Sequence, residues 1–204
     1  MQVEEGAFRG LDNLEELLLD DNNMLAVPQA ALASLKRLRR LSLAYNRIAV
    51  VSGGVFAGSG QLSHLVLSHN VIRELADDAF QPLMALRRLE LRGNRLTGVN
   101  EAAFRHLSTQ LQELDLGRNR IADFDQLEMP QMQYLKLDHN NLTVLRRGQF
   151  HKFINLISVN MSQSHISNQT QITPAFLSLG VATPIASLTG GRDPTGVSLG
   201  LSPP

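Results

Sequence analysis

The stretch Leu38-Arg-Arg-Leu-Ser-Leu-Ala-Tyr-Asn46 decides the fold, because its pattern Leu-x-x-Leu-x-Leu-x-x-Asn recurs along the chain. Copies begin at residues 14, 38, 62, 86, 111, 132 and 156, so the period is 24 residues with one interval of 25 and one of 21. The sixth copy opens with Met132, and the degraded seventh has Ser164 where the others have Asn. Such a repeat predicts a solenoid of stacked units.

Each repeated position has a physical role. Leu-x-Leu puts two leucines on one side of a short strand, and a single strand cannot bury that side alone, so the copies are expected to stack around a shared core. The asparagines are expected to form a ladder, because an amide both donates hydrogen bonds to and accepts them from main-chain groups where the chain leaves the strand. Large rings fill the back of the coils at a repeated position: Phe8, Phe56, Phe80, Phe104 and Phe150.

These motifs resemble leucine-rich repeats of the 24-residue type, as in the ectodomains of animal Toll-like receptors, slit and chaoptin. The resemblance covers about residues 3–166. It implies an α/β solenoid, a leucine-rich-repeat horseshoe with a parallel β-sheet on the concave side and short turns or 3₁₀ segments on the convex side. It also implies a non-catalytic protein-binding module for ligand recognition or cell adhesion, as part of a larger receptor or adhesion protein.

The pattern divides the chain into three parts. Residues 1–13 form a partial leading repeat without its strand, residues 14–170 form a solenoid of seven copies, and residues 171–204 form a Pro/Gly/Ser-rich tail that is expected to be mostly disordered. An apolar stretch in the tail, residues 175–188, is too short to span a membrane and is interrupted by Pro184. We therefore expect no direct membrane insertion by this chain.

The first strand has no preceding copy to cover its leucines, which favours self-association through the N-terminal edge. We interpret the chain as a fragment of a longer array. The alternative is a short protein in which residues 1–12 cover the first copy.

Composition and motifs argue against several functions. With 19 Lys+Arg, 19 Asp+Glu and no Cys, the chain has no net charge to attract nucleic acid and no thiol for catalysis or for metal clusters. The glycine-rich stretch 53–60 lacks the Lys of a phosphate loop and is interpreted as a back-side turn. His69 and His139 lie three copies apart, about 14 Å, too far to share a zinc ion, and with His64 are interpreted as surface histidines. We expect no enzymatic activity, no cofactor and no metal site.

The side of the strands opposite the leucines offers the candidate binding surface. Its outward positions are the two residues after the first Leu, the residue within Leu-x-Leu, and the two residues before Asn. Both tyrosines of the chain, Tyr45 and Tyr134, fall on these positions, as do Arg40 and Arg88. Because Tyr and Arg are frequent binding anchors, these four predict a stripe for a protein ligand or cell-surface protein. The alternative is that they are solvated rim residues, and about half of the charges on this face are expected to pair across strands.

Three Asn-x-Ser/Thr sequons predict glycosylation at Asn141, Asn160 and Asn168. They favour an extracellular or cell-surface location as part of a larger protein. No signal peptide is visible, so an intracellular leucine-rich-repeat scaffold in the cytoplasm stays open as an alternative. A third possibility is the targeting region of an enzyme whose catalytic domain lies outside this chain.

Overall fold

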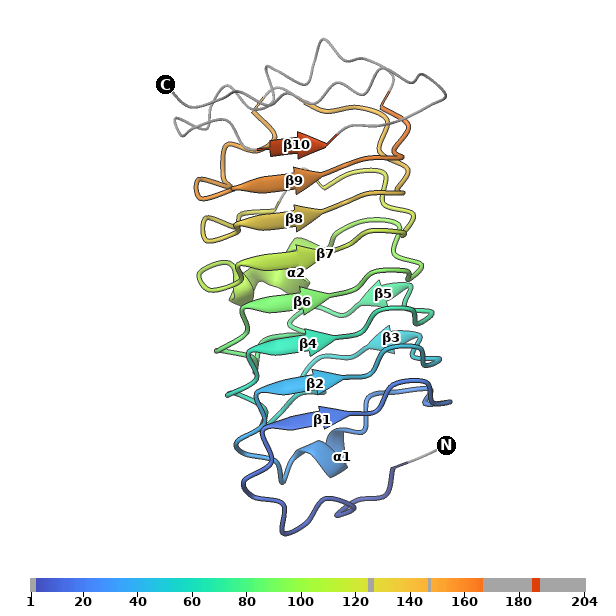
Figure 1. The fold of residues 1–204 in the computed structure, drawn as a ribbon, viewed down its shortest axis with the longest axis vertical. Helices are drawn as coiled ribbons and strands as arrows, with labels where there is room; N and C mark the ends of the chain where they lie inside the picture. Colours follow the sequence, from blue (N-terminus) through green and yellow to red (C-terminus); the bar gives the residue numbers. More distant parts are fainter. Residues whose placement is uncertain (1–2, 125–126, 147, 167–184, 188–204) are drawn as a thin grey trace.

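The computed structural model describes residues 3–124, 127–146, 148–166 and 185–187. The chain winds into one elongated stack in which every copy of the motif forms one coil and contributes one strand to a single parallel sheet (Figure 1). The predicted leucine-rich-repeat solenoid is therefore confirmed. The strands follow one another in chain order: β1 (Glu16–Leu18), β2 (Arg40–Ser42), β4 (His64–Val66), β6 (Arg88–Glu90), β7 (Glu113–Asp115), β8 (Tyr134–Lys136), β9 (Ser158–Asn160) and β10 (Ile185–Ser187).

The register of the sheet aligns equivalent positions of successive coils. The central residue of each motif strand points into the core, and its two neighbours face the opposite side, here called the outer sheet face. The residues before the central one form the first outer column: Glu16, Arg40, His64, Arg88, Glu113, Tyr134 and Ser158. The residues after it form the second outer column: Leu18, Ser42, Val66, Glu90, Asp115, Lys136 and Asn160.

A continuous apolar core runs along the inside of the sheet. Leu43, Leu67 and Leu91 are each 0% exposed, as the motif predicts. The aromatic column also stacks from coil to coil, with ring centroids 6.2 Å apart for Phe56 and Phe80 and 5.7 Å apart for Phe80 and Phe104. Burying each such side chain stabilises the fold by about 1.5–3 kcal/mol.

The predicted asparagine ladder is present and binds each coil to the one before it. The Asn70 side chain accepts a hydrogen bond from the Ile48 main-chain nitrogen at 2.9 Å and donates to the carbonyl oxygens of Leu43 at 2.9 Å and Leu67 at 3.1 Å. Asn46, Asn94, Asn119 and Asn140 repeat this arrangement. In the seventh coil the Ser164 hydroxyl is too short for this role and has no hydrogen-bond partner among the described residues.

The residue directly before each ladder position has a left-handed backbone conformation. Tyr45 has a φ of 53°, His69 of 56° and Arg118 of 53°, and Gly93 occupies this position in the fourth coil with a φ of 69°. The conformation turns the chain so that the following asparagine enters the core, and the main-chain nitrogen keeps its place in the ladder, as in the 3.0 Å bond from Tyr45 to the Ser68 carbonyl. Interstrand bonding therefore offsets a backbone cost of about 1–2 kcal/mol for a non-glycine residue.

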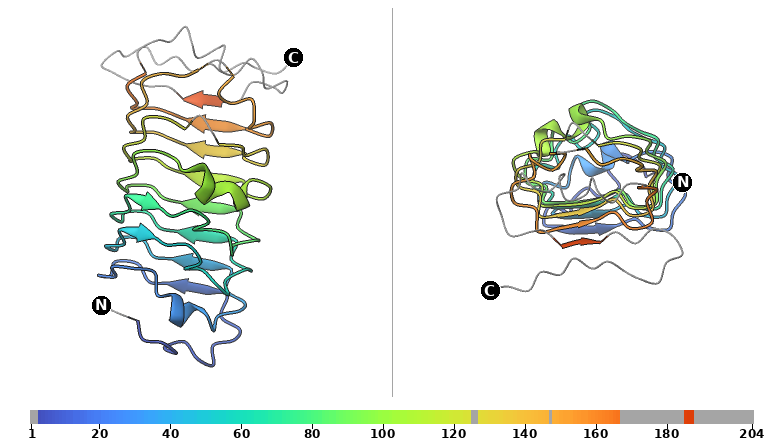
Figure 2. Two further views of the ribbon diagram at one scale, coloured as in Figure 1. Left: turned by 180° about the vertical axis from the view of Figure 1, so that it is seen from behind. Right: turned by 90° about the horizontal axis from the view of Figure 1, so that it is seen from above.

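The side opposite the sheet is built from short pieces, as expected (Figure 2). They are two single-turn α-helices, a 3₁₀ turn and a small two-stranded sheet: α1 (Gln29–Leu32), α2 (Glu101–Phe104), η1 (Arg105–Leu107), β3 (Val50–Val51) and β5 (Glu74–Leu75). Asn100 caps α2 by accepting a hydrogen bond from the Ala102 main-chain nitrogen at 3.0 Å. The helices and the small sheet were not predicted, because segments of two to four residues carry no periodicity.

The two ends of the chain differ from the middle of the stack. Val3 and Phe8 pack against the first coil, and Leu17 is only half-buried there, whereas its counterparts in later coils are buried. Most of the predicted disordered tail lies outside the described residues, but Ile185–Ser187 forms β10, which pairs with β9 and which the sequence pattern did not predict. Among the described residues, no helix has the length and apolar character needed to cross a membrane.

Candidate functional site

The outer sheet face carries a hydrogen-bonded chain of polar and charged side chains. Arg40 Nη1 lies 2.7 Å from His64 Nδ1, and His64 Nε2 lies 3.0 Å from Glu90 Oε1. A guanidinium can only donate, so Nδ1 accepts from Arg40 and Nε2 donates its proton to Glu90. This geometry assigns the neutral Nε2–H tautomer to His64, whose side chain is only 17% exposed. The interpretation of His64 as a surface histidine is therefore wrong, because it lies within this network.

The same network continues in both directions along the sheet. Arg88 Nε lies 2.9 Å from Glu90 Oε1, and its Nη1 lies 3.0 Å from Glu113 Oε2 on the next strand. At the other end, Arg40 Nε lies 2.9 Å from Glu16 Oε1. Five successive strands, β1 to β7 along the main sheet, are thus joined by side chains as well as by their backbones.

The network controls the ionisation of Glu90. The hydrogen bond from His64, helped by the adjacent positive charge of Arg88, lowers the Glu90 pKa from 4.5 to about 2 against the opposing effect of burial. Glu90 is therefore a carboxylate at every physiological pH, and it holds His64 and Arg88 in place.

A second charged bridge spans two strand intervals. Arg92 donates from Nη1 to Asp138 Oδ1 at 3.0 Å and from Nη2 to Asp138 Oδ2 at 2.7 Å, although Gly117 occupies the coil between them. A Cβ at Gly117 would overlap Arg92 Nη1 and lie 2.7 Å from Asp138 Oδ1. The missing side chain at Gly117 is thus the reason that Arg92 can reach Asp138.

Both partners of this bridge have shifted pKa values. Hydrogen bonding to Asp138 raises the pKa of Arg92. Burial is the largest influence on Asp138 and opposes its ionisation, but the hydrogen bonds from Arg92 and His139 outweigh it and lower the Asp138 pKa. Lys136 also pairs with Asp115, with Nζ and Oδ2 3.4 Å apart. The charges on this part of the face are consequently matched within the protein.

The four predicted binding residues do not form one stripe. Arg40, Arg88 and Tyr134 share the first outer column, and both arginines take part in the cross-strand pairing that was expected for about half of the charges. Tyr134 is 41% exposed and lies between Glu113 and Ser158 in this column. Tyr45 lies outside the column, in the turn after β2, where its ring stacks on His69 with centroids 4.4 Å apart and planes at 4°.

Sequence reasoning overlooked two members of the network and misplaced one set of positions. His64 and Glu90 share the outer columns with Arg40 and Arg88, so aligning the repeats could have identified them. The second residue before each ladder asparagine was expected to point outward, but four of these residues are buried because the chain already turns inward there: Ala44, Ser68, Gly117 and Asp138.

The sequons occupy different environments. Asn141 is exposed in the turn after β8. Asn160 lies half-buried in β9, where its side chain accepts a hydrogen bond from the Ser162 main-chain nitrogen at 3.0 Å and donates to Asp138 at 3.4 Å. Asn168 lies outside the described residues. Of the two sequons that the structure describes, Asn141 is therefore the one whose amide group is free of such contacts.

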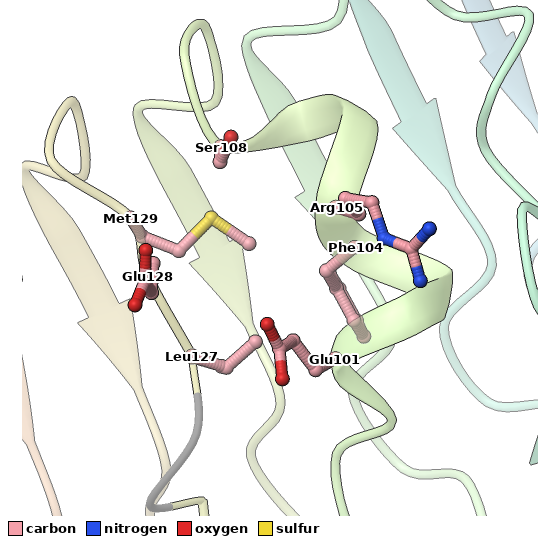
Figure 3. A pocket seen from close by; sticks show the side chains of 7 residues that line it. All are labelled: Glu101, Phe104, Arg105, Ser108, Leu127, Glu128 and Met129. Carbon is pink, nitrogen blue, oxygen red and sulfur yellow. The ribbon is translucent and has the colours of Figure 1, made fainter.

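Two cavities of the described region lack the arrangement of polar groups that is typical of an active site. The fifth coil has only 21 residues and, among those described, no helix to pack beside α2 of the fourth coil, and a pocket of about 80 Å³ opens there. Figure 3 shows Glu101 and Phe104 on one side of this pocket and Leu127 and Met129 on the other. Drug-sized ligands need roughly 300–1,000 Å³. A larger cleft of about 490 Å³ beside the first coil is lined by Val3 and residues 24–30, none of which is titratable. No group of three or more His, Asp or Glu in the described ranges could hold a metal ion.

Comparisons with known proteins agree with this architecture. The family described as "Leucine rich repeat" matches residues 2–48, 12–72, 36–96 and 85–127. No curated protein matches the chain. Similar solved structures include a TLR13–ssRNA13 complex, with 22% identity and a TM-score of 0.71. The leucine-rich repeat domains of APL1 and APL1B show 21% identity each and TM-scores of 0.64 and 0.66.

These likenesses extend over most of this chain but only part of the other proteins. The chain is covered to 93%, 92% and 93%, whereas it spans 30%, 54% and 58% of the TLR13, APL1 and APL1B chains. At such identities the solved structures support the fold. Together with the family match and the stacked coils, they lead to one conclusion: the chain belongs to the leucine-rich-repeat family.

Proposed function

We propose that this chain is a non-catalytic protein-binding module that recognises a protein ligand through the C-terminal half of its outer sheet face. The observation that carries this proposal is a rigid face that ends in exposed apolar groups. Tyr134 is 41% exposed and lies next to Glu113 in the first outer column, and Ile157 on the following coil is 48% exposed. Aromatic and apolar anchors beside fixed charges are typical of binding hot spots.

The charge network supports recognition by keeping this face in one conformation. Arg88 is fixed by Glu90 and Glu113, so a partner would meet groups that are already oriented. Preorganisation of this kind reduces the entropy lost on binding. The paired arginines therefore position the surface, and the partner contacts Tyr134 and Ile157.

We further propose an extracellular or cell-surface location, within a larger receptor or adhesion protein. The exposed Asn141-Leu-Thr143 sequon supports this, because a glycan there would project from a turn without covering the outer sheet face. Peptide mapping of the chain secreted from a eukaryotic cell checks the location: we expect a glycan at Asn141, and an unmodified Asn141 would contradict it.

Site-specific photo-cross-linking tests the binding proposal. A benzoylphenylalanine in place of Tyr134 should capture a protein ligand, and the same group in place of Met84, which is 66% exposed in the segment between Phe80 and β6, should not. Equal capture from both positions would contradict the proposal. Because the similar TLR13 structure contains ssRNA, a single-stranded RNA arm is included, and we expect it to give no adduct at Tyr134.

A further inference from the structure

A second surface runs along the turns that follow the strands. Each coil contributes three positions to this surface: the residue directly before the ladder asparagine, the residue directly after the asparagine, and the third residue after the asparagine. We call this surface the turn edge. In Figure 1 the strand arrows point to the right, so the turn edge lies along the right side of the stack. Main-chain bonds keep these positions aligned between coils, as in the 2.9 Å bond from Arg47 to Met24 and the 2.8 Å bonds from Arg95 to Ile72 and from Arg120 to Leu96.

The turn edge of the second to sixth coils is rich in arginine and lacks acidic residues. Its fifteen positions hold five arginines and no Asp or Glu. All five arginines are exposed, and none forms an ion pair with another described residue: Arg47, Arg73, Arg95, Arg118 and Arg120. These guanidinium groups differ in this respect from Arg40, Arg88 and Arg92 on the outer sheet face.

Acidic residues limit this row at both ends. Asp21 occupies the turn edge of the first coil, and Asp123 follows the last edge position of the fifth coil and pairs with Arg146 at 2.7 Å. Within the row, Glu74 follows the last edge position of the third coil, directly after Arg73, and forms no ion pair with another described residue. The row therefore extends over three coil spacings, roughly 14 Å, which matches about four residues of extended peptide. A longer polyanion would meet the carboxylates at each end, and the chain as a whole has no net charge to attract one.

We propose that the turn edge binds a short acidic polypeptide segment of a protein partner in extended conformation. Arginine binds carboxylates through two parallel hydrogen bonds, so side chains such as Arg95 and Arg118 are suited to Asp and Glu on alternate residues of the segment. The Tyr45–His69 stack lies at the start of the row and gives it an aromatic boundary. This surface is separate from the outer sheet face, so either proposal can fail alone.

Fluorescence anisotropy with a labelled octapeptide of alternating Glu and Ser tests the assignment on the full chain. We expect the peptide to bind, with an affinity that falls as salt increases, and a Gln–Ser peptide not to bind. The triple variant Arg95→Gln, Arg118→Gln, Arg120→Gln should weaken binding about tenfold. A matched triple variant, Lys36→Gln, Arg87→Gln, Arg105→Gln, removes the same charge from exposed positions elsewhere and should change the affinity less than about twofold.

Three results would overturn the proposal: no binding of the Glu–Ser peptide, equal binding of the Gln–Ser peptide, or equal loss in the two triple variants. Single-stranded RNA binding more tightly than the peptide, and lost in the same turn-edge variant, would also overturn it by showing a different class of partner. Thermal melting of each variant ensures that only folded protein is compared.

Discussion

The outer sheet face and the turn edge both carry arginines, but the two surfaces use them differently. On the sheet face, Arg92 is held by both oxygens of Asp138, and Arg88 lies between Glu90 and Glu113. On the turn edge, Arg95 and Arg118 have no carboxylate partner among the described residues. The first set links neighbouring coils, and the second is available to another molecule. Residue type alone does not separate the two sets, because the difference depends on whether a neighbouring coil places a carboxylate within reach of the arginine.

The largest difference in the free energy of unfolding is expected between two single variants in the same coil, each replacing an arginine of one of the two surfaces. Arg92→Ala leaves Asp138, whose side chain is 5% exposed, without its main partner, so we expect a loss of about 3 kcal/mol in the free energy of unfolding. Arg95→Ala should change it by less than about 0.5 kcal/mol. Urea unfolding measures both, and equal effects would remove the difference between the two surfaces.

Glu90→Gln should lower the free energy of unfolding by about 2 kcal/mol at pH 7. The Glu90 pKa of about 2 in the folded state lies below its ordinary value of 4.5, so the carboxylate stabilises the fold above about pH 4.5. That contribution is lost as the pH falls from 4.5 towards 2. The difference in stability between wild type and variant should therefore be full at pH 7 and small near pH 2. A difference that does not change with pH would contradict the role of Glu90.

Adding a single methyl group at Gly117 should weaken the Arg92–Asp138 bridge and leave the rest of the sheet unchanged. Gly117→Ala places a Cβ against Arg92 Nη1 and Asp138 Oδ1, so we expect a loss of about 1 kcal/mol as the flexible arginine moves aside. Gly98→Ala is the matched control, because nothing lies within 4 Å of its added Cβ, and it should stabilise the protein by about 0.5 kcal/mol. Thermal melts that rank the two variants in the opposite order would exclude the bridge as described.

The smallest effect is expected at the tyrosines. Tyr45→Ala removes a ring stacked on His69 at 4.4 Å on the exposed turn edge, which should cost about 0.5 kcal/mol. Tyr134→Ala should leave stability nearly unchanged, because its role is proposed to be in binding. If urea unfolding shows a greater loss for Tyr134→Ala than for Tyr45→Ala, then Tyr134 supports the fold.

The fold could be predicted from the sequence because each core position of the repeat accepts only one kind of side chain. Leu43, Leu67 and Leu91 must be apolar, and Asn70 must both donate and accept hydrogen bonds, so the pattern is visible in a single chain. The left-handed position before each asparagine gave no such signal, because tyrosine, histidine, arginine and glycine all occupy it.

The candidate site was only partly predictable, for a different reason. Repeat alignment places Arg40 and Arg88 on one face, but the partner of each arginine depends on side-chain length and on neighbours two coils away. The Arg92–Asp138 bridge exists because Gly117 has no side chain, which the motif does not specify. Four of the turn-edge arginines follow the ladder asparagine, outside the outward positions that the motif defines: Arg47, Arg73, Arg95 and Arg120. Arg118 lies directly before Asn119, at a position where the motif does not distinguish a paired arginine from an unpaired one.

Labelling arginines with an arylglyoxal reagent, followed by mass spectrometry of individual sites, tests the central distinction most directly. The reagent attacks accessible guanidinium groups, and pairing with Asp138 raises the Arg92 pKa and so disfavours reaction. We predict rapid modification of Arg95, Arg118 and Arg120 in the folded protein and slow modification of Arg88 and Arg92. Similar rates for all five in the folded protein would contradict the account.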